Sequence, residues 1–237
     1  MSRLLVLKLG GSLLTDKRRP YSLRTDVLKA AASEVATCLR DGIVDKLVVV
    51  HGVGSYGHPP VIEHKLYKGF LDRSQLLPLS RTQSKVNELR AAITSCLQDE
   101  GVAVNLFHTS SIASATRGRI TSMDLDAVRG FLMVDMVPVL GGDMVHDTEM
   151  GFSVGSGDQV AAIVAKELKA TDLVFATDVA GVYESDPKAT PGARLIPHLS
   201  LSDLTATASA SGAKGDASGA MKGKDPKTSA PSTATVA

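Results

Sequence analysis

The residues best suited to chemistry near the start of the chain are Lys8, Gly10, Gly11 and Ser12, which end a short apolar run. Glycines let a backbone approach a ligand closely, and successive free amide groups can cradle an anion. The lysine adds a positive charge beside that cradle. A glycine pair after a strand can also be an ordinary turn, but the neighbouring lysine favours phosphate binding.

A cluster of cationic side chains follows in the run Asp16-Lys17-Arg18-Arg19. Such a run usually forms a solvated basic loop. Lys17 becomes a candidate only because Lys8 precedes it in the same strand-to-helix segment.

A second glycine-rich segment, residues 51–59, also follows an apolar run. Open α/β sheets place ligands at the carboxyl ends of their strands. We expect a loop here, with three glycines, a serine and two histidines converging on it. Histidine can donate a hydrogen bond to a phosphate, so His58, within the glycine run, is favoured as a ligand contact. For His51, at the strand end, a capping or packing role is favoured.

Two later segments place carboxylates at predicted strand ends. Ser156 or Asp158 is a natural N-cap for the helix that follows. One of these two residues is expected to be the N-cap. Asp158 could instead orient lysine ammonium groups. Asp178 by itself indicates turn chemistry. No Walker loop of the form G-x-x-x-x-G-K-[ST] occurs, so bound phosphates would need a different cradle.

The elements that must position these residues alternate between strands and helices. Continuous apolar runs predict buried strands at 4–9, 47–50, 102–107, 137–140 and 173–176, and helical spacing of apolar residues predicts helices at 25–39, 84–97 and 159–168. This alternation indicates an α/β fold, a three-layer α/β/α sandwich with a mainly parallel central sheet. Residues 145–154 predict a hairpin that protrudes at the sheet edge.

The composition bounds the possible partners. The 237 residues are 43% hydrophobic, enough for a substantial core, and 26 basic residues nearly balance 25 acidic ones. This balance argues against nucleic acid and membrane surfaces as partners and favours a small molecule. Two cysteines without metal-binding spacing, no signal peptide and no apolar run of membrane-spanning length predict a cytoplasmic protein.

Taken in order, the motifs resemble the amino acid kinase superfamily, and within it the isopentenyl phosphate kinases. The resemblance spans about residues 4–224 and rests on K-L-G-G-S followed by T-D-K, V-H-G-V-G-S-Y-G-H, G-G-D-M-V-H-D, S-G-D and T-D-V-A-G-V-Y. It implies ATP-dependent phosphorylation of isopentenyl phosphate to isopentenyl diphosphate, a step of isoprenoid precursor synthesis. It further implies ATP and Mg²⁺ as cofactors, a small phosphate as substrate and a homodimer as the assembly.

The resemblance also implies roles for single residues. The implied catalytic residues are Lys8, Lys17, His58, Asp158 and Lys224. The implied acceptor-binding residues are Val53, His58 and Gly157. The implied ATP-binding residues are Lys8, Leu9, Gly10, Gly11, Ser12, Gly54, Asp178, Ala220 and Lys224. Among these, Lys17 would reach the transferring group and Asp158 would organise the lysines. Few dedicated metal ligands are expected, because Mg²⁺ would bridge the nucleotide phosphates.

The same resemblance suggests a division of the chain. We expect an amino acid kinase domain over residues 1–204, with an acceptor lobe at roughly 1–155 and the start of a nucleotide lobe at 156–204. The predicted helix over 72–97, with Tyr67 and Phe70 before it, would wall a short hydrocarbon tail. Residues 205–237 are mostly small and polar, so we expect a disordered tail that carries a remnant nucleotide-binding segment.

Two alternatives stay open. A kinase for another small phosphate or phosphonate, such as a fosfomycin kinase, shares the glycine-histidine segment. A catalytically impaired nucleotide-binding homologue fits two departures from the family pattern. Ala220 stands where the family has a second glycine, and the family's closing helix and strands are replaced after Lys224 by D-P-K-T-S-A-P-S-T-A-T-V-A.

Overall fold

The computed structural model describes residues 3–16, 18–185, 187, 189–190 and 192–196, together with the backbone of residues 234–236. Within them a six-stranded sheet runs in the order β12-β9-β1-β2-β6-β3, and all of its pairings are parallel. Its strands are β1 (Leu4–Leu9), β2 (Lys46–His51), β3 (Val104–Leu106), β6 (Val137–Gly141), β9 (Asp172–Ala176) and β12 (Ala234–Val236). Each of the five predicted strands is present.

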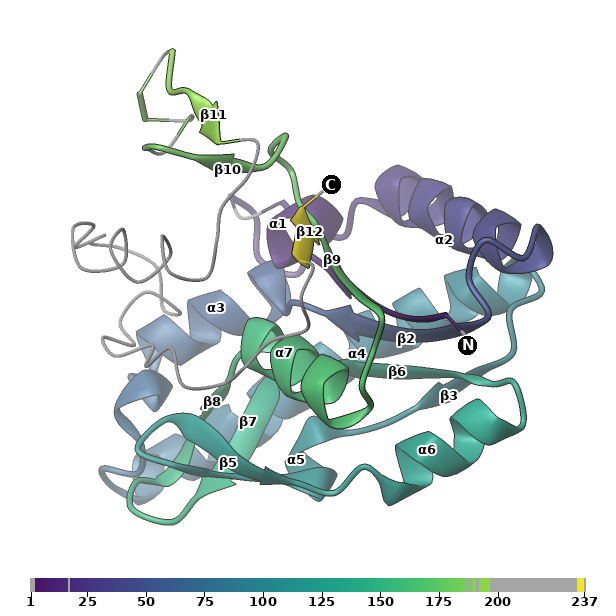
Figure 1. Cartoon of the computed structure of the whole chain (residues 1–237). Helices are drawn as coiled ribbons and strands as arrows, with labels where there is room; N and C mark the ends of the chain where they lie inside the picture. Colours follow the sequence, from purple (N-terminus) through teal and green to yellow (C-terminus); the bar gives the residue numbers. More distant parts are fainter. Residues whose placement is uncertain are drawn as a thin grey trace.

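Helices cover both faces of this sheet (Figure 1). On one face, α2 (Thr25–Arg40) and α4 (Leu76–Asp99) pack over Leu47 and Val49. On the other, α6 (Asp126–Met133) and α7 (Gly157–Glu167) pack over Val48 and Val50. Because successive side chains of a strand point to opposite faces, the continuous apolar run of β2 supplies both cores. The predicted three-layer α/β/α sandwich with a mainly parallel sheet is confirmed.

The predicted hairpin is present, but it does not extend the central sheet. Strands β7 (Asp143–Asp147) and β8 (Gly151–Gly155) pair antiparallel and join β4 (Ala113–Thr116) and β5 (Arg119–Met123) in a separate four-stranded sheet, in the order β5-β4-β7-β8. The predicted hairpin is therefore confirmed, and its strands belong to this second sheet rather than to the central one. Pairing between β4 and β7, which are distant in the chain, decides it.

The second glycine-rich segment is a helix rather than the expected loop. Helix α3 (Gly54–Glu63) begins directly after Gly52 and Val53 and contains both Pro59 and Pro60. Glycine and proline are strong local breakers, so the sequence pattern favoured a loop. Tertiary packing decides otherwise, because most of the first turn of α3 is buried against neighbouring elements.

Short elements complete the described chain. They are α1 (Gly11–Leu14), η1 (Leu66–Lys68), η2 (Arg73–Gln75), α5 (Thr109–Ile112), β10 (Val182–Tyr183) and β11 (Leu195–Ile196). Asp72 caps η2 by accepting from the backbone N–H of Ser74, and α4 follows η2 directly at Leu76. Apart from the backbone of β12, the predicted tail over 205–237 lies outside the described residues.

Candidate active site

The carboxyl ends of the central strands stand level with one another. Leu9 of β1 pairs with His51 of β2 on one side and Ala176 of β9 on the other, and His51 pairs in turn with Gly141 of β6. The segments that follow these strands therefore meet at one edge of the sheet. This edge holds a cavity of about 160 Å³, lined from β1, α1, α3, α4 and the hairpin that leads into α7.

An ion pair lies at the polar end of this cavity. The Nζ of Lys8 is 2.9 Å from Oδ1 of Asp158, and the lysine side chain is 15% exposed. Ser156 is the N-cap of α7, because its Oγ accepts from the backbone N–H of Asp158. The Asp158 carboxylate thus pairs with the Lys8 ammonium and does not cap the helix. The sequence had left both roles open for Asp158.

Glycines allow two backbone segments to touch beneath the cavity. A Cβ placed on Gly11 would lie 2.5 Å from the backbone nitrogen of Gly54, and one on Gly52 would lie 2.6 Å from that of Gly11. Gly54 also has a φ of +46°, where side chains are strained. A Cβ on Gly157 would lie 2.8 Å from the carbonyl oxygen of His51. The cradle is therefore assembled from segments that only glycine lets approach.

Helix N-termini add to the attraction for anions. Helices α3 and α7 both begin at this edge, at Gly54 and Gly157, and both residues line the cavity. Free backbone N–H groups and the helix dipole make such ends favourable for phosphate groups. Together with Lys8 they place hydrogen-bond donors at the polar end, beside the Asp158 carboxylate.

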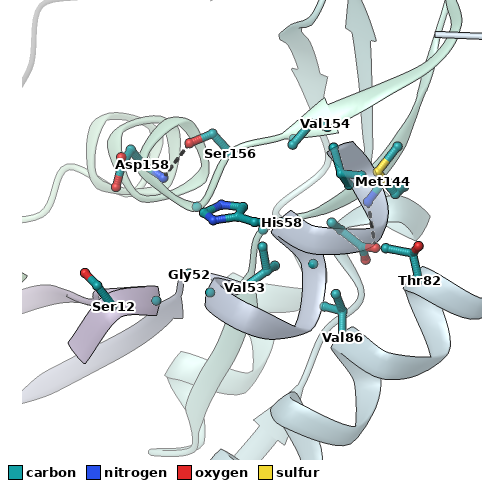
Figure 2. Close-up of a pocket in the computed structure, with 18 of the residues that line it drawn as sticks. Ser12, Gly52, Val53, His58, Thr82, Val86, Met144, Val154, Ser156 and Asp158 are labelled. Atoms are coloured by element: carbon teal, nitrogen blue, oxygen red, sulfur yellow. Dashed lines mark hydrogen bonds between the residues drawn. The ribbon is translucent and has the colours of Figure 1, made fainter. Parts of the chain in front are cut away.

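The two histidines of the glycine-rich segment have different surroundings. His58 lies on α3 and lines the cavity, where Figure 2 shows its ring between Val53 and the start of α7. His51 is completely buried, with its ring against Gly141. Burial, together with the nearby charge of Arg90, lowers the pKa of His51 to about 3, so its ring is neutral. The structure thus places His58 at the cavity and His51 in the interior.

The opposite end of the cavity is apolar. Val61 of α3, Val86 of α4, and Met144 and Val154 of the hairpin line it, and Thr82 adds a hydroxyl. Figure 2 shows Thr82, Val86 and Met144 grouped on the side away from Asp158. Sequence reasoning missed most of this wall, because nothing in the local pattern separates these residues from ordinary core.

Tyr67 and Phe70 were expected to wall a hydrocarbon tail, and that expectation is wrong. Neither residue lines the cavity, and their exposed fractions are 38% and 48%. Phe70 instead packs edge-to-face on Phe152, with ring centroids 6.4 Å apart. Helix α4 contributes to the wall through Thr82 and Val86 instead.

The remaining predicted residues lie near the cavity or outside the described part. Ser12 Oγ donates to Oδ1 of Asp178 at 2.9 Å, which joins the ends of β1 and β9. Leu9 packs in the core and does not line the cavity, although its carbonyl accepts from the Gly52 N–H. Gly10 donates its N–H to the carbonyl of Ala176. Lys17, Ala220 and Lys224 lie outside the described residues.

The described residues contain no group of three or more His, Cys, Asp or Glu side chains placed to hold a metal ion. In that same part of the chain, no helix combines the length and apolar character needed to cross a bilayer.

An open parallel sheet whose strand ends carry glycine-built anion cradles, a lysine and two helix N-termini defines an α/β phosphate-binding protein. A model of the amino acid kinase family matches residues 3–236. Isopentenyl phosphate kinase of Methanothermobacter thermautotrophicus is 34% identical over 210 residues, which cover 85% of this chain and 77% of that protein. The Methanocaldococcus jannaschii enzyme of the same name is 32% identical, covering 76% and 70%. This chain belongs to the amino acid kinase family and, within it, to the isopentenyl phosphate kinases.

Solved structures agree with this assignment. An X-ray structure of isopentenyl phosphate kinase superposes with a TM-score of 0.78 at 32% identity, covering 87% of this chain and 85% of that one. A substrate complex of isopentenyl phosphate kinase gives the same TM-score at 26% identity, covering 98% and 90%.

Proposed function

We propose that this protein transfers the γ-phosphoryl group of ATP to isopentenyl phosphate, forming isopentenyl diphosphate and ADP. One observation carries the proposal: the cavity combines Lys8, several glycines and two helix N-termini at one end with an apolar wall at the other. That division suits a phosphate attached to a short hydrocarbon tail. The similarity to isopentenyl phosphate kinases supports the same substrate.

The transfer needs positioning more than covalent chemistry. Phosphoryl transfer proceeds by in-line displacement, so the protein acts mainly by aligning the two phosphates and stabilising the charge on the transferring oxygens. The acceptor is a phosphate monoester, which is largely ionised near neutral pH and needs no strong general base. We therefore assign His58 to bind and orient the acceptor phosphate, while Lys8, aimed by Asp158, stabilises the transferring group.

The nucleotide would be held by the glycine segments. Gly11 and Gly54 let the segments after β1 and β2 lie against each other, so backbone N–H groups of both segments can face its phosphates together. We propose that Lys17 and Lys224 add charge to the same phosphates and that Asp178 lies beside the nucleotide. When bound, Mg²⁺ neutralises charge on the nucleotide phosphates.

The domain division is proposed on the same basis. The acceptor lobe comprises roughly residues 1–155, the nucleotide lobe starts at 156, and residues 205–237 carry a nucleotide-binding segment that includes Ala220 and Lys224. The full-length Lys224→Met variant should then show a raised KM for ATP and an unchanged KM for the acceptor. An unchanged KM for ATP would count against a nucleotide role for this segment.

We further propose a homodimer and a cytoplasmic location. Large exposed apolar side chains are concentrated over residues 62–77, namely Ile62, Tyr67, Phe70, Leu71, Leu76 and Leu77, which we call the 62–77 strip. Such concentrations commonly mark protein interfaces. Both cysteines, Cys38 and Cys96, are free thiols, as suits a reducing compartment. Cell fractionation tests the location.

The test of the activity is direct. Purified protein with MgATP and isopentenyl phosphate should yield ADP and isopentenyl diphosphate in equal amounts, and EDTA should stop the reaction. His58→Ala and Lys8→Ala should each lower kcat/KM at least about 100-fold, the range of lost phosphate positioning. Lys29→Ala, at an exposed lysine of α2, is the control. Turnover of fosfomycin but not isopentenyl phosphate, or ATP binding without turnover, would reject the proposal.

A further inference from the structure

Arg90 is a buried charge that the proposed reaction does not yet use. It lies on α4, one helical turn beyond Val86 of the cavity wall, and its side chain has no exposed surface. Arginine is rarely buried completely unless it is paired, because removing its charge from water is strongly unfavourable. Its partners therefore indicate what the buried charge holds in place.

The guanidinium joins elements that are far apart in the chain. Its Nε donates to Nε2 of His51 at 3.2 Å, and its Nη2 lies 3.5 Å from Oδ2 of Asp143. Its Nη1 donates to Asn87 Oδ1 at 2.8 Å and to Nδ1 of His108 at 2.9 Å. One side chain of α4 thus holds the end of β2, the start of β7 and the segment after β3.

The contact with His51 determines the tautomer of that ring. A guanidinium can only donate, so Nε2 of His51 must accept and the ring proton must be on Nδ1. That proton points to the carbonyl of Gly52, 3.2 Å from Nδ1. Burial keeps the ring neutral, with a pKa lowered to about 3. The result is a chain of hydrogen bonds from Arg90 through His51 to the carbonyl of Gly52. The backbone of Gly52 in turn packs on Gly11.

The contact with Asp143 leads to the acceptor side of the cavity. Asp143 is almost fully buried and lines the cavity, and its Oδ1 accepts from the backbone N–H of Met144 at 2.8 Å. Its Oδ2 accepts from the N–H and Oγ of Ser110. The neighbouring Gly142 N–H donates to the carbonyl of His51 at 3.0 Å. Arg90 therefore contacts His51, which lies next to the glycine cradle, and Asp143, which lies next to the opposite wall of the cavity.

We propose that Arg90 is a positioning residue for phosphoryl transfer, which holds His51 and Asp143 so that the backbones of Gly52 and Met144 face the acceptor at a fixed separation. The inference rests on the proposed function. A lysine at the same place would keep the positive charge, but it lacks the planar fork that reaches His51 and Asp143 together. The positive charge of a lysine at this position is therefore not expected to substitute for the Arg90 side chain.

The experiment compares full-length Arg90→Lys and Arg90→Met with Arg81→Lys and Arg81→Met, which change an exposed arginine of the same helix. We expect both Arg90 variants to lower kcat/KM for isopentenyl phosphate by about 10- to 100-fold, the size of effect produced by small misplacements. The ¹⁵N signals of the His51 ring, assigned with His51→Gln, should show the Nδ1–H tautomer in the wild type. In the Arg90 variants the His51 ring signals should no longer show the Nδ1–H tautomer alone. The Arg81 variants should match the wild type in both kcat/KM and the His51 signals.

Other outcomes separate this inference from the proposed function. Wild-type kcat/KM and unchanged His51 signals in folded Arg90→Lys, with only a lower Tm, would overturn the positioning role. If the wild type lacks kinase activity, the proposed function fails. Calorimetric binding of isopentenyl phosphate then decides the role of Arg90, which is supported by affinity at least tenfold weaker in Arg90→Lys and overturned by equal affinity.

A second pair of variants applies if the Arg90 variants do not fold. His51→Gln retains an acceptor for the Arg90 guanidinium, whereas His51→Phe fills the ring volume without one. Positioning through Arg90 predicts that His51→Gln keeps most of the kcat/KM and that His51→Phe loses it. Equal values for the two variants would overturn the proposal.

Discussion

Lys8 and Asp158 meet at the polar end of the cavity, although they are far apart in the amino-acid sequence. The ammonium of a lysine is a point charge on a flexible stem, so its direction has to be imposed by a neighbour. Asp158 does this from the first turn of α7, where Ser156 already satisfies the helix cap. The carboxylate is therefore available to aim Lys8 rather than to begin the helix.

Asp158→Asn tests this separation of roles. The substitution keeps the shape of the side chain and removes its charge, so we expect kcat to fall by about 10- to 100-fold with little change in Tm. Asp126→Asn is the matched control, because Asp126 also lies in the first turn of a helix and is exposed. Steady-state kinetics and thermal melts give both quantities. An equal loss of kcat in the two variants would refute the assignment.

At the scale of elements, the site depends on how closely the backbones after β1 and β2 approach. The nearest atoms to a Cβ on Gly11 would be backbone atoms of Gly54, which cannot move aside as a flexible side chain can. A methyl group here would therefore push α1 away from α3. The same displacement would enlarge the phosphate cradle.

Gly11→Ala should consequently lose both activity and stability. Overpacking of this kind costs about 1–3 kcal/mol in the free energy of unfolding, and ATP binding should weaken as the cradle opens. Gly130→Ala on α6 is the control, since no atom lies within 4 Å of its added Cβ and its φ is not positive. It should gain up to about 1 kcal/mol through helix propensity. Urea unfolding and ATP titration measure both effects, and a neutral Gly11→Ala would contradict the packing argument.

The hairpin of β7 and β8 depends on one buried carboxylate at its turn. Asp147 accepts from the backbone N–H groups of Gly118, Glu149 and Met150 at 2.8 to 3.0 Å. Burial opposes its charge, but these donors outweigh burial and lower the pKa of Asp147 to about 2. The carboxylate therefore ties the turn after β4 to the hairpin that forms part of the cavity wall.

A lowered pKa makes this carboxylate a source of stability above the pKa of the unfolded chain, about 3.8. The contribution, roughly 2 kcal/mol, should be present at neutral pH and be lost as the pH falls from about 4 towards 2. Asp147→Asn should lower the neutral-pH Tm by about 4–8 °C and weaken the dependence of stability on pH in that window. Asp41→Asn, at an exposed position, is the control. An unchanged pH dependence in Asp147→Asn would disprove the assignment.

For the whole molecule, the cavity and the 62–77 strip occupy different parts of the surface. The strip includes the end of α3 and the start of α4, while the cavity is lined by other residues of the same helices. A dimer formed through the strip would hold these two helices together from outside. Assembly would then support the acceptor wall without contributing a residue to it.

Leu77→Glu should convert the proposed homodimer to a monomer, because a charge would be buried at the interface without a partner. Sedimentation or light scattering should give half the mass of the wild type at micromolar concentration. Met133→Glu is the matched control, since Met133 is equally apolar and 81% exposed but lies on α6. A wild type that is monomeric, or a Leu77→Glu variant that stays dimeric, would rule out this interface.

The amino-acid sequence by itself was enough to locate the central strands and the helices α2 and α7. It was also enough to identify the charged residues of the site. Lys8, His58 and Asp158 could be found because glycines, a lysine and a carboxylate at strand ends are local signals. The same reasoning correctly placed His51 in a packing role. It failed for residues 54–59, where local breakers suggested a loop and burial produced the start of helix α3.

Only the tertiary structure decided which of these residues meet. The Lys8–Asp158 pair, the backbone contact of Gly11 with Gly54, and the Arg90 network each join segments that are well separated in the chain. The apolar wall likewise combines α3, α4 and the hairpin, and it excludes Tyr67 and Phe70. Periodicity and motifs report the local preference of the backbone, whereas contacts between distant segments depend on strand order and on close packing of the whole fold.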